Sequence, residues 1–172
     1  TKAPKVQLYL NDKLIETRDV NIGTEYKATI KLPYQPGVLK AVALDANGKG
    51  IAERILRTSK EPAAIRLTPD RNIISADGED LAYVTLEIID KDGNLVPDAT
   101  IPVNVTVSGQ GTLLAAATAN LKDIEPKTSP RVTTYKGRAL IVVRSGQKAG
   151  KATISATSSE LKGAFKKSVT VK

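Results

Sequence analysis

The sequence predicts an all-β protein built from antiparallel β-sandwiches, and three observations lead to that prediction. Short stretches of apolar and β-branched residues recur along the chain, as expected for strands with one buried face. Turn-forming sequences such as Asn47-Gly48 and Gly93-Asn94 separate these stretches. No window of helical length carries an apolar stripe with caps at its ends.

Three strands are expected in the first part of the chain. Residues 6–10 and 38–44 consist mainly of apolar and β-branched side chains, which favour strands. Residues 25–32 form a third run of this type. The turn sequences that bound these strands are Asn11-Asp12, Pro36-Gly37 and Asn47-Gly48.

The second part of the chain contains the clearest strand, residues 81–90. A polar corner at residues 76–80 precedes it, and a hairpin turn at residues 90–94 follows it. Apolar groups lie on one face of this strand at a period of two, at Ala82, Val84, Leu86 and Ile88. The other strands expected here are residues 65–67, 101–107, 138–144, 151–157 and 164–171.

A domain boundary is expected near residues 58–62, a polar segment that ends in proline. We therefore expect one sandwich domain at residues 1–60 and a second at residues 61–172. A domain of about 60 residues buries only about 60% of its unfolded surface and is marginal on its own. The first domain also starts almost within its first strand at Lys5, so we expect it to be truncated at its N-terminus or to depend on a neighbour.

The composition excludes several kinds of chemistry. The 172 residues include no Cys, His, Met or Trp, which rules out disulfides, thiol catalysis and a Ser-His-Asp triad. No run of about 18 apolar residues is present that could span a membrane. Without an initiator Met or a signal peptide, the chain reads as part of a longer protein.

The net charge of +8 does not indicate nucleic-acid binding. Residues 1–62 hold 11 Lys and Arg against 7 Asp and Glu, and residues 63–172 hold 15 against 11, so the positive charge is spread evenly. Proteins that bind single strands interleave basic groups with stacking aromatic rings, and this chain has only five Tyr and one Phe. We expect a solvated basic surface.

Two groups of carboxylates are candidates for glycosidic acid–base catalysis. They are Asp77, Glu79 and Asp80 in the corner, and Asp90 and Asp92 in the hairpin turn. Aspartate is common in turns because it bonds its own backbone. A catalytic carboxyl needs burial or a charged partner, and an exposed turn supplies neither. We therefore expect turn-forming roles and no catalytic residue.

Residues 90–94 also resemble the start of a calcium loop, with oxygen ligands at alternate positions before a glycine. A twelve-residue loop closes on an acidic residue, but position 101 is Ile. A looser oxygen cage that uses Asp98 or Asp70 is the alternative. We expect a turn without metal.

Aromatic and glycine residues supply the remaining candidates. Gly109 and Gly111 are followed by no helix, so we expect a strand bend at this point and no phosphate site. Tyr9, Tyr26 and Tyr34 could receive the apolar face of a sugar, although packing is the commoner role for Tyr. Tyr34 lies in a proline-rich turn and is the best single candidate for a sugar contact.

The region of residues 115–135 has no strand alternation and carries two prolines among charged residues. A connection of this length in a small domain is usually a functional or a mobile loop. Binding residues are often carried on such loops. We expect a loop here, without an assigned role.

Residues 6–13 (VQLYLNDK) and 32–43 (LPYQPGVLKAVA) resemble an Ig-like accessory domain of bacterial glycoside hydrolase family 2 enzymes. Residues 62–97 and 135–158 are similar to the C-terminal domain of the same β-galactosidases. Asp12 and Leu44 depart from that pattern, as does the 115–131 loop. The resemblance implies two Ig-like β-sandwiches placed after a catalytic barrel. It also implies that the barrel holds both catalytic glutamates, so none of them corresponds to a residue of this chain.

We therefore interpret the chain as the non-catalytic C-terminal accessory region of a bacterial family 2 enzyme, a retaining β-galactosidase. It should hold no cofactor and no metal. The expected partners are the other domains of the longer enzyme, together with carbohydrate at Tyr34. Nucleic-acid binding and membrane insertion are not expected. The resemblance suggests a periplasmic or secreted location.

Two alternatives remain open at this point. The first is a carbohydrate-binding module. The second is a pair of tandem Ig-like repeats from a bacterial surface adhesin, because the pattern of residues 67–99 also occurs in invasin-like repeats.

Overall fold

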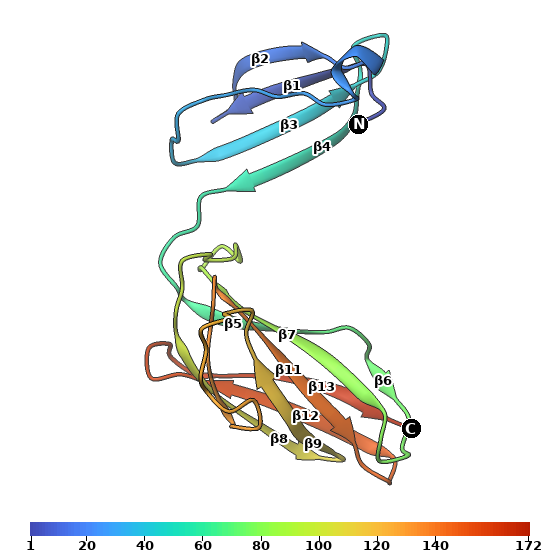
Figure 1. Ribbon diagram of the computed structural model, residues 1–172, viewed down its shortest axis with the longest axis vertical. Helices are drawn as coiled ribbons and strands as arrows, with labels where there is room; N and C mark the ends of the chain where they lie inside the picture. The colour runs from blue at the N-terminus through green and yellow to red at the C-terminus, as the bar shows by residue number, and fades with distance from the viewer. The chain divides into compact units, whose positions relative to one another are not determined.

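The computed structural model describes residues 1–172 and contains thirteen strands and one short 3-10 helix (Figure 1). The chain divides into two compact units, Thr1–Thr58 (unit 1) and Ser59–Lys172 (unit 2). Every strand pair is antiparallel except a short parallel pairing in unit 2. The predicted all-β, antiparallel class is confirmed. The structure contains no helix with the length and apolar character needed to cross a membrane.

Unit 1 is built on one four-stranded sheet in the order β2-β1-β3-β4. Its strands are β1 (Lys5–Leu10), β2 (Lys13–Asp19), β3 (Val38–Leu44) and β4 (Gly50–Arg57). Asn11 and Asp12 join β1 to β2 with φ values of 50° and 63°, as a tight hairpin turn requires. The 3-10 helix η1 (Ile22–Thr24) starts after Asn21, whose side chain accepts two backbone N–H groups of that turn.

One sequence expectation for unit 1 was wrong, and two strands were missed. Residues 25–32 pair with no strand. Glu25 and Tyr26 adopt positive φ values of 52° and 58°, which turns the backbone out of an extended path. Conversely, β2 and β4 were not predicted, because most of their side chains are exposed and show no apolar alternation.

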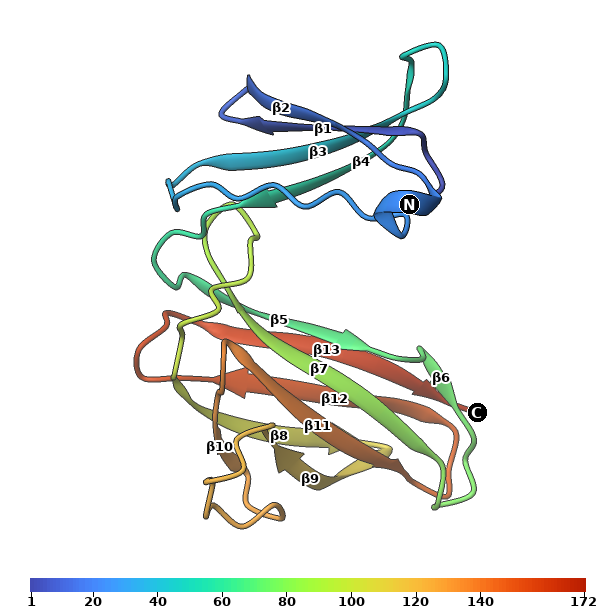
Figure 2. The same ribbon diagram turned by 45° about the horizontal axis from the view of Figure 1, so that its top comes forward.

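Unit 2 is a β-sandwich of two sheets (Figure 2). One sheet has the order β10-β8-β12-β13-β6 and the other β5-β7-β11-β9. The strands of the first sheet are β6 (Ile73–Ile74), β8 (Pro102–Gly109), β10 (Arg131–Thr133), β12 (Gly150–Thr157) and β13 (Ala164–Val171). Those of the second are β5 (Ala64–Pro69), β7 (Leu81–Ile89), β9 (Gly111–Ala117) and β11 (Arg138–Ser145).

The inward-facing residues of the two sheets form one apolar core. The alternation predicted for β7 is confirmed, because its four apolar residues from Ala82 to Ile88 are fully buried. Large side chains from other strands complete the core, among them Val103, Val105, Ile141, Val143, Ile154 and Val169. Full burial of such a side chain contributes about 1.5–3 kcal/mol to the free energy of folding. The core of unit 2 is therefore large enough to stabilise this unit by itself.

The bend predicted at Gly109 and Gly111 lies between β8 and β9. Gly109 has a φ of +83°, and a Cβ on it would lie 2.2 Å from the carbonyl oxygen of Lys151. Only glycine fits such a close approach of two backbones. The loop expected at residues 115–135 is shorter than predicted, because β9 runs on to Ala117 and β10 begins at Arg131.

Candidate functional site

The turn after β7 is organised around the carboxylate of Asp90. This side chain is buried, with 1% of its surface exposed, which corrects the expectation of an exposed turn. Its oxygens accept hydrogen bonds from the backbone N–H groups of Lys60 (2.9 Å), Asp92 (2.9 Å) and Asn94 (2.8 Å). These donors, the Lys60 N–H foremost, lower the pKa of Asp90 from 3.8 to about 2. Asp90 is therefore a structural residue that is ionised at neutral pH.

The corner before β7 uses its carboxylates in the same way. Asp77 accepts hydrogen bonds from the backbone N–H groups of Glu79 and Asp80, both at 2.8 Å, and these bonds lower its pKa. Asp80 accepts the Ser75 N–H at 2.7 Å, which is the main cause of its own lowered pKa. A general acid at neutral pH needs a raised pKa. These residues have the opposite property.

The turn of residues 90–94 does not offer a cation the vacant oxygen atoms that calcium needs. Both oxygens of Asp90 already accept N–H donors, and calcium takes 6–8 oxygen ligands. Asp92 pairs with the ammonium group of Lys60 at 2.5 Å. Asp70, the alternative ligand, accepts the Tyr83 N–H at 2.8 Å. No three Asp or Glu side chains lie in a geometry that could hold a metal ion.

A cluster that the sequence analysis missed lies on the outer face of the β5-β7-β11-β9 sheet. Glu87 accepts hydrogen bonds from Arg66 at 2.7 and 3.0 Å and from Arg138 at 3.0 Å. Desolvation works against ionisation of Glu87, but these two guanidinium groups outweigh it and keep its pKa below the usual value. The three residues are directly paired across β5, β7 and β11, so only the strand register could have revealed them.

An apolar hollow of about 540 Å³ adjoins this cluster. Leu140, which is 40% exposed, lies in it between Thr85 on β7 and Ala117 on β9. Tyr135 lines the hollow as well, and the Lys136 ammonium lies 5.9 Å from the centre of its ring. The remaining lining residues are Thr118, Ala119, Arg138 and Ala139.

The loop between β9 and β10 begins beside this hollow and is held by its own hydrogen bonds. Asp123 accepts bonds from the Lys127 ammonium and the Glu125 N–H, which lower its pKa. Leu121 and Ile124 nevertheless point into solvent, with 101% and 95% exposure. An ordered loop with two fully exposed aliphatic side chains is a candidate contact surface.

The three tyrosines considered for sugar contact lie in different settings in unit 1. Tyr34, which follows Pro33, has a ring that is open to solvent, because 81% of the residue is exposed. Tyr9 is half-buried on β1; its hydroxyl donates to Gln7 at 2.7 Å, and the Lys40 ammonium lies 5.1 Å from its ring centre. Of these rings, Tyr34 is the most accessible to a ligand.

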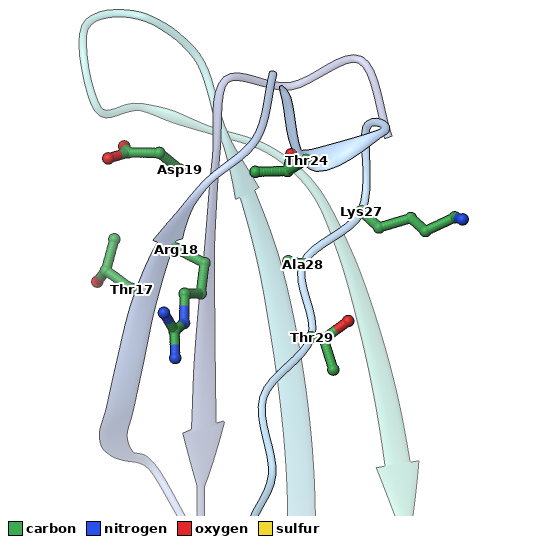
Figure 3. A pocket seen from close by; sticks show the side chains of 7 residues that line it. All are labelled: Thr17, Arg18, Asp19, Thr24, Lys27, Ala28 and Thr29. Carbon is green, nitrogen blue, oxygen red and sulfur yellow. The ribbon is translucent and has the colours of Figure 1, made fainter. Parts of the chain in front are cut away.

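A polar hollow of about 540 Å³ lies between β2 and residues 24–29 of unit 1. Figure 3 shows Arg18 and Asp19 on one side and Ala28 and Thr29 on the other, with the Lys27 side chain extending away from β2. Asp19 supplies the one carboxylate of this hollow, and that group is 74% exposed. The hollow therefore lacks the second carboxyl group that glycosidic catalysis uses.

Comparison with known families gives two matches that follow the two units. Residues 65–166 match the model of the glycoside hydrolase family 2 C-terminal domain 5. Residues 1–52 match a domain of unknown function, DUF4982. The first match covers more than half of the chain.

Individual relatives agree with this result. Beta-galactosidase BoGH2A of Bacteroides ovatus is 37% identical over 166 residues, which are 96% of this chain and 19% of the relative. A beta-galactosidase of Thermoanaerobacter pseudethanolicus is 26% identical over 170 residues, 90% of this chain and 21% of the relative. The crystal structure of a glycosyl hydrolase family 2 member from Bacteroides cellulosilyticus superposes with a TM-score of 0.89 at 30% identity, over 99% of this chain and 22% of that one. The chain thus spans about a fifth of the length of these relatives.

Proposed function

Because the chain belongs to the glycoside hydrolase family 2 C-terminal domains, we propose that it is a non-catalytic accessory region that acts as a scaffold within a bacterial family 2 enzyme. The use of its carboxylates carries this proposal. Asp77, Asp80 and Asp90 are bound by backbone N–H groups and have lowered pKa values. A retaining glycosidase needs two carboxyl groups about 5–5.5 Å apart, one of them with a raised pKa.

The longer enzyme, on this proposal, is a retaining β-galactosidase. The names of two relatives support this choice. Its acid–base and nucleophile glutamates lie in a catalytic barrel outside residues 1–172, as the family resemblance implies. The role of residues 1–172 is then to pack against other domains of the enzyme. The exposed Leu121 and Ile124 side chains support a packing role, because they offer apolar area to a neighbour.

An activity assay tests this division of labour. The 172-residue chain and the full-length enzyme are incubated with an aryl β-galactoside, and only the full-length enzyme should release the aryl group. In the full-length enzyme, Asp77→Asn and Glu79→Gln should leave kcat within a few-fold of the parent. Loss of a catalytic acid or base costs roughly 10²–10⁴-fold. A loss of that size with an unchanged melting temperature would place catalysis in this chain.

A carbohydrate contact at Tyr34 is a second candidate function. The observation that favours it is the accessibility of the ring, which is 81% exposed and could stack on the apolar face of a sugar. Calorimetric titration of the chain with galactose-containing oligosaccharides should give a binding heat that Tyr34→Ala abolishes. Tyr26→Ala, at a ring that is 51% exposed, is the matched control. Binding that persists in Tyr34→Ala would remove this candidate.

We also propose a periplasmic or secreted location for the longer enzyme. The proposal rests on the family resemblance alone, because the absence of Cys fits a cytosolic protein as well as an exported one. Fractionation of the source cells, with detection by an antibody against unit 2, tests this proposal. Recovery of the enzyme with the cytoplasmic fraction alone would contradict it.

A further inference from the structure

Residues 28–32 of unit 1 have the side-chain pattern of a strand but no strand partner. Ala28, Ile30 and Leu32 are half-buried, whereas Thr29 and Lys31 are exposed, which is the alternation of a strand on an apolar layer. No hydrogen bond joins a backbone N–H or C=O group of residues 28–35 to another part of the protein. The segment therefore presents free backbone donors and acceptors along both of its edges.

This 28–32 segment covers only part of the sheet beside it. Leu10, Leu39 and Leu56 are directly paired across β1, β3 and β4 and form one apolar row. Leu10 lines a hollow together with Lys31 and Leu32 and is 9% exposed. Leu39 is half-buried, and Leu56 is 59% exposed. The burial of these leucines thus decreases along the row from β1 to β4, so no second layer of backbone covers this face of the sheet over β3 and β4.

We propose that the 28–32 segment receives a β-strand from the part of the longer enzyme that lies outside residues 1–172. That strand hydrogen-bonds to one edge of the segment and completes a second layer over Leu39 and Leu56. The inference rests on the proposed function, since it requires that the chain works as part of a longer enzyme. Relatives are about five times as long as this chain, so they contain ample sequence to supply such a strand.

The charges on the segment favour this occupant over a second copy of the same chain. Lys27 and Lys31 lie at either end of the segment, and Pro33 follows it. Lysine and proline on a free strand edge disfavour pairing between identical edges. A strand with apolar side chains at every second position would match the half-buried face of the segment. Its main-chain bonds would give affinity, and its alternate side chains would give specificity.

Hydrogen exchange in the full-length enzyme tests the proposal at single-amide resolution. Backbone groups of alternate residues point to opposite edges of a strand. Pairing on one edge should therefore slow exchange either at Thr29 and Lys31 or at Ala28, Ile30 and Leu32. We expect at least a hundredfold slower exchange than at the amides of Tyr34 and Gln35, which serve as the unpaired reference.

Proline substitutions provide the matched control. Ala28→Pro and Thr29→Pro each remove one N–H group, and these two groups point to opposite edges. Only the variant on the paired edge should abolish the protection of its neighbours, whereas Thr29→Ala, which keeps the N–H, should preserve it. Exchange of all five amides at the reference rate overturns the proposal. Protection that appears only at high protein concentration also overturns it, in favour of a second copy.

These readouts separate the inference from the proposed function. An enzyme with slow exchange in the segment but no β-galactosidase activity contradicts only the proposed function. An active enzyme whose segment exchanges freely contradicts only the strand pairing.

Discussion

Substitution of Gly109 by alanine should destabilise unit 2 far more than the same change at Gly93. Both glycines have a positive φ, +83° and +82° respectively, so both variants incur the same backbone strain. A Cβ at position 109 would lie 2.2 Å from the carbonyl oxygen of Lys151, whereas a Cβ at position 93 would meet no atom within 4 Å. The pair therefore separates steric overlap from backbone strain.

The expected magnitudes follow from these distances. An alanine with positive φ costs about 1–2 kcal/mol, which is the whole effect at Gly93. At Gly109 the Lys151 oxygen must retreat by about 1.2 Å to reach an ordinary contact at 3.4 Å, which costs roughly another 1–3 kcal/mol. The same oxygen accepts the Gln110 N–H at 2.8 Å, and its loss adds about 1 kcal/mol. Gly109→Ala should thus cost about 3–6 kcal/mol in total.

Calorimetry of the 172-residue chain measures the difference. Unit 2 comprises about 110 residues, and about 2.1 cal/mol/K per residue gives an unfolding entropy of about 0.23 kcal/mol/K. The transition of unit 2 should fall by roughly 13–26 °C in Gly109→Ala and by about 4–9 °C in Gly93→Ala. Equal shifts in the two variants would refute the steric argument.

Three further outcomes are expected. Asp90 has a folded pKa of about 2 against an ordinary 3.8. Its ionised form therefore stabilises unit 2 above pH 4, and that stability is lost as the pH falls from about 4 to 2. The melting temperatures of the parent and of Asp90→Asn should converge toward pH 2, and a difference that stays constant with pH would contradict this. Asn21→Ala removes the cap of η1 and should lower the stability of unit 1 by about 1 kcal/mol, with the melting transition of unit 2 unchanged. Glu87→Gln leaves Arg66 and Arg138 without their shared anion and should lower the stability of unit 2 by about 1–3 kcal/mol. Asp19→Asn, at an exposed ion pair, should change stability by less than about 1 kcal/mol. Similar losses in both variants would argue against a special role for the Glu87 cluster.

The sequence predicted strands best where one face is buried and the other is solvated. The strand β7 shows this, because burial against the opposite sheet demands apolar groups at every second position. The strands β2 and β4 are held by backbone ladders and expose most of their side chains. Their side chains can therefore be polar, and their sequences show no apolar alternation that would predict a strand. Residues 25–32 were predicted as a strand from their apolar pattern but pair with no other strand. The pattern reports which side chains are buried and not whether the backbone is hydrogen-bonded.

The candidate sites show the same division. Aspartates near glycine were correctly predicted to form turns, because that chemistry is local. The burial of Asp90 was missed because one of its donors, the Lys60 N–H, lies thirty residues earlier in the chain. The Glu87 cluster joins three strands and depends on register, which the sequence does not display. The assignment of Tyr34 to a sugar contact stays a prediction.

The parallel pairing of β6 with β13 gives unit 2 a mechanical property. The backbone bonds that join the segment around β6 to the end of β13 include Thr170 N–H to Asn72 O (2.8 Å), Lys172 N–H to Ile74 O (3.0 Å) and Ala76 N–H to Lys172 O (2.7 Å). A pulling force on the two ends of the unit would slide these parallel segments past each other along their length. These bonds would then carry the load together and would have to break at once, so the unit should resist stretching more strongly than a sheet that opens one bond at a time.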